Sequence, residues 1–177
     1  MKPASLFRFA SCRNGTAAAE MALVTPFLIV LMFGAFELGN YFLSEHVVVK
    51  AVRDGARYAA RLNLTNYPCT AASPDNIPGG TVEQDTQNLV RTGQIDDGGT
   101  ARLSGWTDGI TTVTITYDCV ASDSASPAYS GIYDGLDNVP VVTVAASVPY
   151  SSLFTDLGFE SSTLSLNAEA QSVVMGI

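Results

Sequence analysis

Residues 21–36 read MALVTPFLIVLMFGAF, sixteen consecutive positions without a charged side chain. With its flanks, this apolar run extends from Thr16 to Leu43 and is interrupted only by Glu20 and Glu37. A helix needs about 20 mostly apolar residues to cross the hydrocarbon core of a bilayer. The run therefore predicts a membrane-spanning helix over residues 16–43 and a chain that is anchored in a membrane, at least when it is first made.

Charge is distributed in three blocks along the chain. The first block holds Lys2, Arg8 and Arg13 and no acidic residue. Residues 16–61 carry four basic and four acidic side chains, whereas residues 62–177 carry two basic and thirteen acidic ones, a net charge of −11. Because Lys and Arg collect on the cytoplasmic side of a membrane span, we expect a cytoplasmic N-terminus and an exported acidic domain. Such a domain is a poor candidate for binding nucleic acid, which requires clustered cations.

The segment before the apolar run differs from an ordinary secretory signal peptide. Such a signal has its small-x-small cleavage site after the apolar stretch, and no such site closes this run. Small residues precede the run instead, at positions 15–19. Residues 9–12, Phe-Ala-Ser-Cys, match a lipoprotein processing site only in part, because no apolar stretch comes before them. The remaining option is cleavage on the cytoplasmic side, which would leave the helix on the mature chain.

The order of Gly15, four small residues beginning with Thr16, Glu20 and an apolar helix resembles the processing site of type IV prepilins. In that family a membrane peptidase cuts after the glycine. The resemblance implies that residues 1–15 are a basic leader, that Thr16 becomes the first residue and that Glu20 becomes the fifth. The prepilin peptidase is then one partner of the chain.

Three segments narrow the resemblance to the TadE-like family: AAEMALVTPFL at 18–28, FELGN at 36–40 and AVRDGARYAA at 51–60. These proteins are minor pilin-like proteins, or pseudopilins, of the tight-adherence (Tad, or Flp) pilus system. The resemblance covers residues 13–62, and beyond them only the general layout is similar. Met21 departs from the family pattern, which commonly has Phe or Tyr after the glutamate.

The TadE-like resemblance implies a minor pilin or pseudopilin in the bacterial inner membrane, with its C-terminal domain in the periplasm. Its role would be assembly, priming or adhesion of the pilus. Its implied partners are other pilins, the inner-membrane assembly proteins and the lipid bilayer. The alternative is a membrane-tethered periplasmic binding or adhesion module that is not processed as a prepilin, and a tethered hydrolase is a third, weaker hypothesis.

Glu20 needs a partner, because a carboxylate at the edge of hydrocarbon is costly. Cleavage after Gly15 would create an ammonium at Thr16, four residues earlier on the same helix face. This ammonium, or that of a neighbouring subunit, would offset the cost of burying the carboxylate. The simpler alternative is a glutamate that reaches up to the headgroups.

Glu37 lies 17 residues further on, about 25 Å along a helix, where it either reaches water at the far interface or pairs within a helix bundle.

Residues 16–62 read as one long helix, which Pro26 should kink or loosen because it lacks a backbone donor. Beyond Glu37, over residues 44–62, the helix becomes amphipathic. Apolar residues near 3.6-residue spacing predict a stripe that packs on the protein's own domain in preference to a partner. The stripe consists of Phe42, Val47, Ala51, Gly55, Tyr58 and Leu62, and the opposite side carries Glu45, Lys50, Arg53, Arg57 and Arg61.

Residues 63–177 predict a small acidic domain, which gives the whole chain an α+β fold with a pilin-like layout. Its first part, 63–80, is rich in Pro, Asn and Gly and predicts a linker or folded loop. Thr81 and Gln84 predict a capping box that opens a short helix over 82–92. Gly93 is expected to end that helix.

Alternating apolar side chains then predict three strands, over 111–120, 139–148 and 164–174. We expect an antiparallel meander packed against the upper part of the long helix. The residues expected to face inward are Val113, Ile115, Tyr117 and Cys119 in the first strand, Val142, Val144, Ala146 and Val148 in the second, and Leu164, Leu166, Ala168 and Ala170 in the third.

The three cysteines divide between the leader and the exported domain. Cys12 lies in the leader, whereas Cys69 and Cys119 lie in the exported part, where disulfides form. If the leader is removed, an even pair remains. We therefore predict a Cys69–Cys119 disulfide that closes a loop of about 50 residues, with two unpaired thiols as the alternative.

The sequence contains few residues in patterns typical of catalysis, metal binding or cofactor binding. His46 is the single histidine and lies just past the span, where we expect a solvated interfacial side chain. No glycine-rich phosphate loop is present, and the exported cysteines lack CxxC spacing. Residues 96–98 and 134–138 offer oxygen ligands for Ca²⁺ but do not match the EF-hand pattern, so we expect solvated turns whose Asp and Gly serve the backbone geometry. We expect no catalytic residue, metal site or cofactor, and hence a protein that is not an enzyme.

Overall fold

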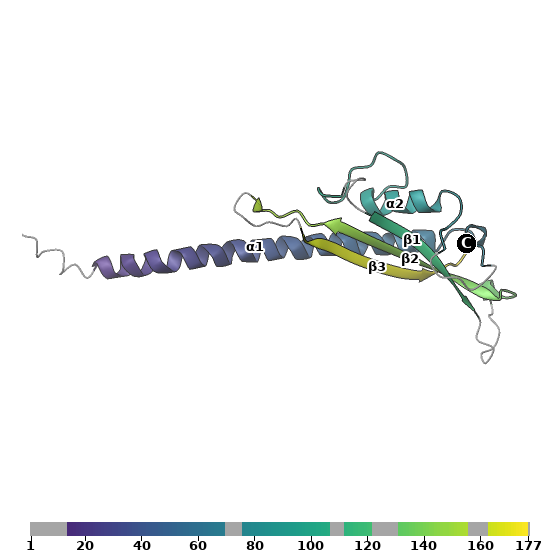
Figure 1. Ribbon diagram of the computed structural model, residues 1–177, viewed down its shortest axis with the longest axis horizontal. Helices are drawn as coiled ribbons and strands as arrows, with labels where there is room; N and C mark the ends of the chain where they lie inside the picture. The colour runs from purple at the N-terminus through teal and green to yellow at the C-terminus, as the bar shows by residue number, and fades with distance from the viewer. Residues whose placement is uncertain (1–13, 70–75, 107–111, 122–130, 156–162, 177) are drawn as a thin grey trace, which may run out of the picture. The chain divides into compact units, whose positions relative to one another are not determined.

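The computed structural model describes residues 14–69, 76–106, 112–121, 131–155 and 163–176 (Figure 1). The chain divides into two compact units, Met1–Asn40 and Tyr41–Ile177. The predicted leader lies almost wholly outside the described residues, since their first member is Asn14. Each unit is described here by itself.

Helix α1 spans Asn14–Ala59 and continues through Pro26. Within it, Thr16–Ala59 is long and apolar enough to cross a membrane, with a mean hydropathy of 2.1 over an 18-residue window of which no part is buried. The helix ends three residues before the predicted end at Leu62. Hydrogen bonds of the tighter i→i+3 type replace the helical ones there, from Arg61 N to Tyr58 O and from Leu62 N to Ala59 O.

The buried face of α1 in the second unit matches the predicted stripe at Ala51 and Gly55, and differs from it at the other positions. Phe42 is 50% exposed, and Val47, Tyr58 and Leu62 are only partly buried. Small residues and valines form the face that packs on the domain, and this face is rotated around the helix relative to the prediction. Its members are Val48, Ala51, Val52, Gly55, Ala56 and Ala59.

The sheet is a three-stranded antiparallel meander in the order β1-β2-β3. Strand β1 spans Thr112–Ala121, β2 spans Asn138–Pro149 and β3 spans Ser165–Val173. Each end lies within one residue of the predicted boundary. The predicted topology and the α+β fold class are therefore confirmed.

The two faces of the sheet differ as the alternation predicts. The expected inward residues of β1 and β2 are all buried, and Leu166 of β3 is 1% exposed. Ala168 and Ala170 are partly buried and pack against the core, whereas Leu164 precedes β3 and is 50% exposed. The outer face is polar or half-exposed and carries Thr114, Thr116, Thr143, Ser147, Asn167, Glu169 and Gln171.

Helix α2 spans Val82–Thr92, as predicted, and ends at Gly93. Gly93 has a φ of 83°, and its N–H donates to Leu89 O. The predicted capping box is wrong, since Thr81 makes no side-chain cap and its hydroxyl donates instead to Asp85 Oδ2 at 2.6 Å. The cause is the backbone of Thr81, whose ψ of 3° is far from the extended conformation that an N-cap requires.

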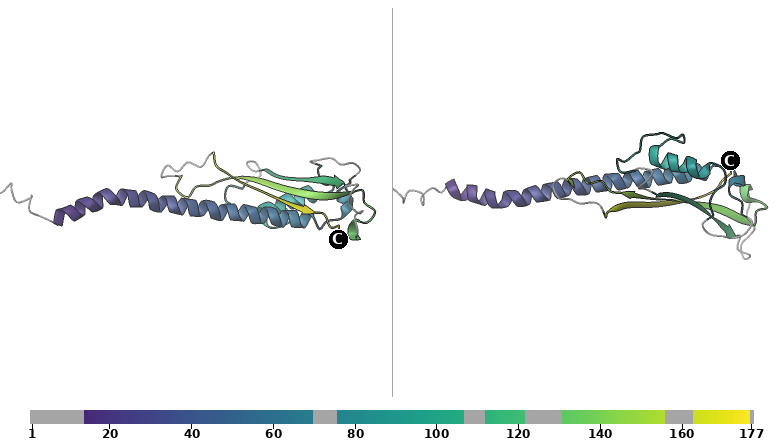
Figure 2. Two further views of the ribbon diagram at one scale, coloured as in Figure 1. Left: turned by 90° about the horizontal axis from the view of Figure 1, so that it is seen from below. Right: turned by 45° about the horizontal axis from the view of Figure 1, so that its top comes forward.

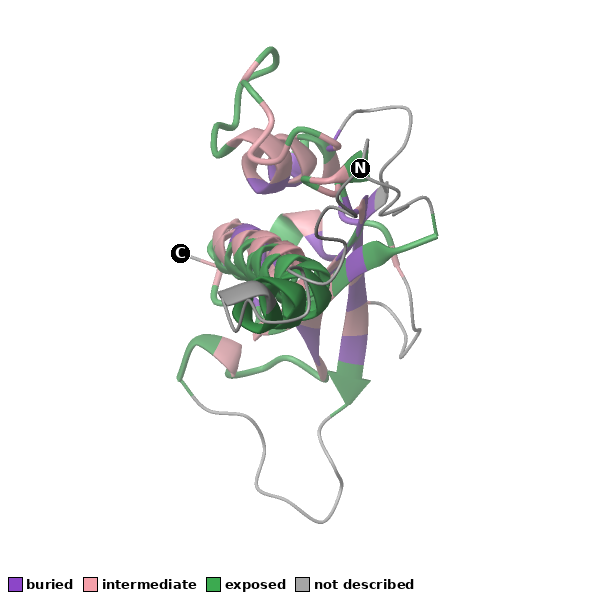
Figure 3. Ribbon diagram, turned by 90° about the vertical axis from the view of Figure 1, so that its left-hand side faces the viewer, coloured by how far each residue is buried: buried purple, intermediate pink, exposed green. Residues whose placement is uncertain are grey.

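Both helices of the second unit lie against one face of the sheet (Figures 1 and 2). The end-on view shows buried residues on the sides where α1, α2 and the strands meet (Figure 3). Gln87 of α2 donates from Nε2 to Val113 O of β1 at 3.1 Å. Trp106, which is fully buried, belongs to the same core. The domain therefore has one core, shared by two helices and three strands.

Candidate functional site

The predicted processing site lies at the first turns of α1. Thr16 and Glu20 are both exposed and are four residues apart in the helix. This spacing places them on one face, where a carboxylate meets a cation at the earlier position. The pairing itself requires the ammonium that cleavage would create, and it stays a prediction.

The apolar part of α1 presents large side chains outward on all sides. Its exposed members include Met21, Leu23, Phe27, Leu28, Val30, Leu31, Phe36 and Leu38, with exposed fractions of 55–71%. Contiguous apolar surface of this extent is typical of a membrane or protein contact. The side chain of Glu37, on the same helix, is by contrast partly buried.

Pro26 interrupts the hydrogen-bond ladder of this segment by lacking an N–H. The neighbouring Thr25 hydroxyl donates to Met21 O at 2.6 Å, a side-chain bond to the preceding turn. Such bonds are associated with bent helices. The helix nevertheless continues on both sides of Pro26.

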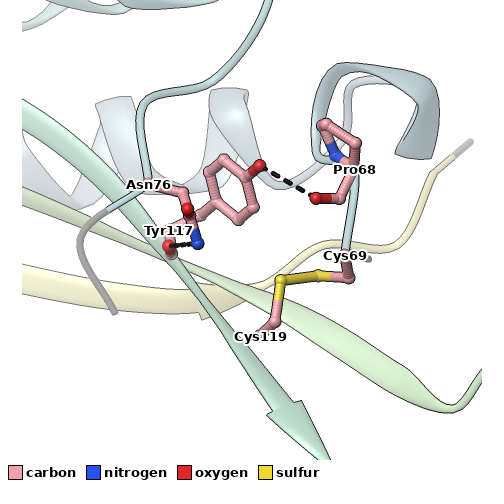
Figure 4. Close-up of a disulfide and its surroundings, with 5 residues drawn as sticks. All are labelled: Pro68, Cys69, Asn76, Tyr117 and Cys119. Carbon is pink, nitrogen blue, oxygen red and sulfur yellow. Dashed lines mark hydrogen bonds between the residues drawn. A yellow bond between two sulfur atoms is a disulfide. The ribbon is translucent and has the colours of Figure 1, made fainter. Parts of the chain in front are cut away.

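Cys69 and Cys119 form a disulfide, with 5.6 Å between their Cα atoms (Figure 4). It joins the segment after α1 to β1. Two further contacts tie the same regions together. Asn76 exchanges backbone hydrogen bonds with Tyr117 at 3.0 and 2.8 Å, and the Tyr117 hydroxyl donates to Pro68 O at 3.2 Å.

Tyr67 fastens this segment to the end of α1. Its ring is 2% exposed and packs edge-on against Tyr117, with 5.4 Å between centroids. Its hydroxyl donates to Ala59 O at 2.6 Å, so this carbonyl at the end of the helix has a second donor beside Leu62 N. The sequence reasoning missed this role, because Tyr67 lies in a stretch whose Pro, Asn and Gly predict only a loop.

Burial raises the pKa of three tyrosines of the domain. The effect is large at Tyr67, where the nearby Tyr58 adds to it, and smaller at Tyr117. The pKa of Tyr58 is raised mainly by burial. The negative charge of Asp85 and a hydrogen bond to Asp85 raise it further. All three phenols therefore stay protonated at neutral pH and act as hydrogen-bond donors.

The residues considered for metal or acid–base chemistry lie apart from one another. His46 is exposed on α1, and Asp96, Asp134 and Asp137 are exposed in two loops. Asp97 accepts a hydrogen bond from Asn88 Nδ2 at 2.8 Å, so it organises the turn after α2. Within the described part of the chain, no three His, Cys, Asp or Glu side chains gather in a way that could hold a metal ion.

The chain was compared with protein-family models, curated proteins and solved structures. Residues 15–57 match the family model of TadE-like proteins. The match confirms the resemblance over the apolar helix and most of its amphipathic continuation, and it begins at Gly15. Curated proteins and solved structures gave no match.

The family match therefore covers the N-terminal helix and leaves the acidic domain outside it. Interpretation of the helix is supported by the family match. The domain, whose residues 58–177 lie beyond that match, is interpreted from its fold, its disulfide and its charge.

Proposed function

We propose that this TadE-like chain is a minor pilin or pseudopilin of a bacterial tight-adherence (Flp) type IV pilus. It is a structural protein, not an enzyme, and it acts in assembly, priming or adhesion of the pilus. The observation that carries the proposal is the match over residues 15–57, which begins at the glycine of the processing motif and continues into an exposed apolar helix.

The proposed topology follows from hydropathy and charge. The apolar part of α1 crosses the inner membrane, and the three cations of the leader hold the N-terminus in the cytoplasm. The acidic domain is then periplasmic, in the compartment where a Cys69–Cys119 disulfide is stable. An extracellular pilus is a further possible destination of the same domain.

The proposed mechanism is helix packing in a bundle of pilins. A prepilin peptidase removes residues 1–15, and the new ammonium of Thr16 pairs with Glu20 of its own or of a neighbouring chain. In surroundings of low dielectric, a pair between two chains fixes the register of their helices, because another register leaves these charges unpaired. Glu37 and the flexibility around Pro26 would assist the packing.

Substitution of Glu20 tests this mechanism in cells. Glu20→Ala should leave cleavage largely intact and reduce pilus output several-fold, because the helix can insert but loses its register. Sheared pili and the cleaved chain are measured side by side by immunoblotting. Glu45→Ala, on the same helix beyond the apolar run, serves as the control and should leave both unchanged. Normal piliation with Glu20→Ala would contradict the register role.

A further inference from the structure

The exposed residues of α1 beyond His46 are all cations, and Asp54 on the same side of the helix is half-buried. Lys50, Arg53, Arg57 and Arg61 are all exposed and recur at intervals of three or four residues, which places them on one face of the helix and its final turn. We call these four residues the basic ridge. It extends about 16 Å along the helix axis.

The basic ridge has no acidic partner among the residues of its own chain that the structure describes. Among the described residues, none of the four cations takes part in an ion pair. Asp54, an acidic neighbour on α1, is turned toward Arg102 at 3.8 Å instead. Like charges three and four residues apart repel one another, so an acidic partner would relieve repulsion as well as add attraction.

The rest of the domain carries the opposite charge. Residues 62–177 contain thirteen acidic and two basic side chains. The exposed acidic residues among the described ones are Asp96, Asp97, Asp134, Asp137 and Glu169. A second copy of the chain therefore offers an acidic surface to the basic ridge of the first.

We infer that the basic ridge docks on the acidic domain of a second copy of this chain. The contact is head-to-tail, since each copy contributes a different surface to it. Repeated contacts of this type close into rings or propagate as open filaments. The inference rests on the proposed function only for the membrane anchoring that brings copies side by side.

A lipid surface fits the ridge less well than a protein does. Lys50 lies seven residues beyond Leu43, the end of the apolar run, but Arg61 lies eighteen residues beyond it. Headgroups beside the end of the run therefore reach the ridge at one end only. A protein surface along the helix meets all four cations.

Zero-length cross-linking of the full-length protein in non-ionic detergent tests the docking. The donor is Arg57→Lys/Arg61→Lys, which keeps the ridge charge and adds amines that a carbodiimide joins to contacting carboxylates. It is mixed with a ¹⁵N-labelled second copy, so that intermolecular links are recognised by mass. We expect links from ridge lysines to acidic residues of 62–177 in the labelled copy, and a several-fold loss of links at 0.5 M NaCl because salt screens exposed charges.

Neutralising the ridge distinguishes a head-to-tail contact from general association. The variant Arg53→Gln/Arg57→Gln/Arg61→Gln should form at least fivefold fewer cross-links from its own Lys50. Its acidic domain is unchanged, so it should still accept cross-links from the lysines of the donor. The control Thr114→Glu/Asn167→Glu/Gln171→Glu changes the net charge equally on the outer face of the sheet and should keep most of its links. Circular dichroism and the intact Cys69–Cys119 peptide show that each variant is folded.

Four outcomes would overturn the inference. Three of them are undiminished links from Lys50 in the neutralised variant, failure of that variant to accept links from the donor, and an equal loss of links in the control. A fourth is lost binding to phosphatidylglycerol vesicles with unchanged cross-links, which would assign the ridge to lipid. The cross-links are read on the purified chain whether or not its leader is cleaved, so failure here and failure of the pilin proposal are separate results.

Discussion

Gly55 lies where α1 approaches α2 and the sheet. A Cβ added at this position would stand 2.4 Å from Val90 Cγ2 and 3.3 Å from Thr86 Cγ2, and both side chains are fully buried. We predict that Gly55→Ala destabilises the domain by about 1–3 kcal/mol through overpacking, although Ala favours an exposed helix by about 1 kcal/mol. Urea unfolding followed by the fluorescence of Trp106, the single tryptophan, measures the change.

Gly39 provides the matched control for this substitution. A Cβ there would meet nothing within 4 Å, so Gly39→Ala should leave the urea midpoint unchanged or raise it slightly. A Gly55→Ala protein as stable as the wild type would show that α1 and α2 do not pack as described.

Tyr67 couples the stability of the domain to alkaline pH. Its pKa is higher in the folded state than the ordinary value of 10.0, so the folded state retains a proton that the unfolded state loses. The contribution of Tyr67 to stability should be constant below pH 10 and decrease as the pH rises above it. Tyr67→Phe should weaken this decrease, while Tyr58 and Tyr117 maintain part of it because their pKa values are also raised.

The same variant should be less stable at neutral pH, by about 0.5–1.5 kcal/mol, because the buried Ala59 carbonyl loses one of its two donors and keeps only the N–H of Leu62. Urea midpoints at pH 8 and pH 10.5 for both proteins test the two expectations together. Equal pH dependence in the two proteins would exclude Tyr67 as a contributor to the alkaline loss.

The disulfide links two elements that are far apart in the sequence, the segment after α1 and strand β1. Because it closes a loop of 50 residues, Cys69→Ser/Cys119→Ser should lower the free energy of unfolding by about 2–4 kcal/mol. The Trp106 fluorescence assay measures this loss, with the reduced wild type as the comparison. Free, alkylatable thiols on both residues of the membrane-extracted protein would contradict the linkage.

At the scale of elements, the strands and α2 were predictable and the packing face of α1 was not. Period-two alternation of Val, Ile and Thr defines a strand almost to the residue, since one slip would turn every apolar side chain to water. In α1, valines and alanines occur on several sides, so spacing alone does not select the buried face. The close approach at Gly55 selects it, and that contact depends on α2 and Val144 of β2.

Two further features depend on tertiary structure in the same way. Thr81 and Gln84 fit the local pattern of a capping box, but the backbone entering α2 turns the Thr81 hydroxyl to Asp85. The cations of the basic ridge are visible in the sequence as the polar side of the helix. Only the folded domain shows that its described residues leave them without an acidic partner.

At the scale of the whole molecule, three features follow one another along the chain: a basic N-terminal segment, an apolar helix and an acidic domain that contains a disulfide. Each suits a different environment, namely cytoplasm, bilayer and an oxidising compartment. This order is what the proposed prepilin-type processing requires, because the cut must fall on the cytoplasmic side and leave the helix attached to the domain.

The N-terminus of the membrane-extracted protein tests the central claim most directly. Intact mass or terminal sequencing should find a chain that begins at Thr16, which would place a free ammonium one helical turn before Glu20. A chain that still begins at Met1 in cells that express the pilus peptidase would contradict prepilin-type processing. It would leave Glu20 without its proposed partner and favour a membrane-tethered periplasmic module in place of a pilin.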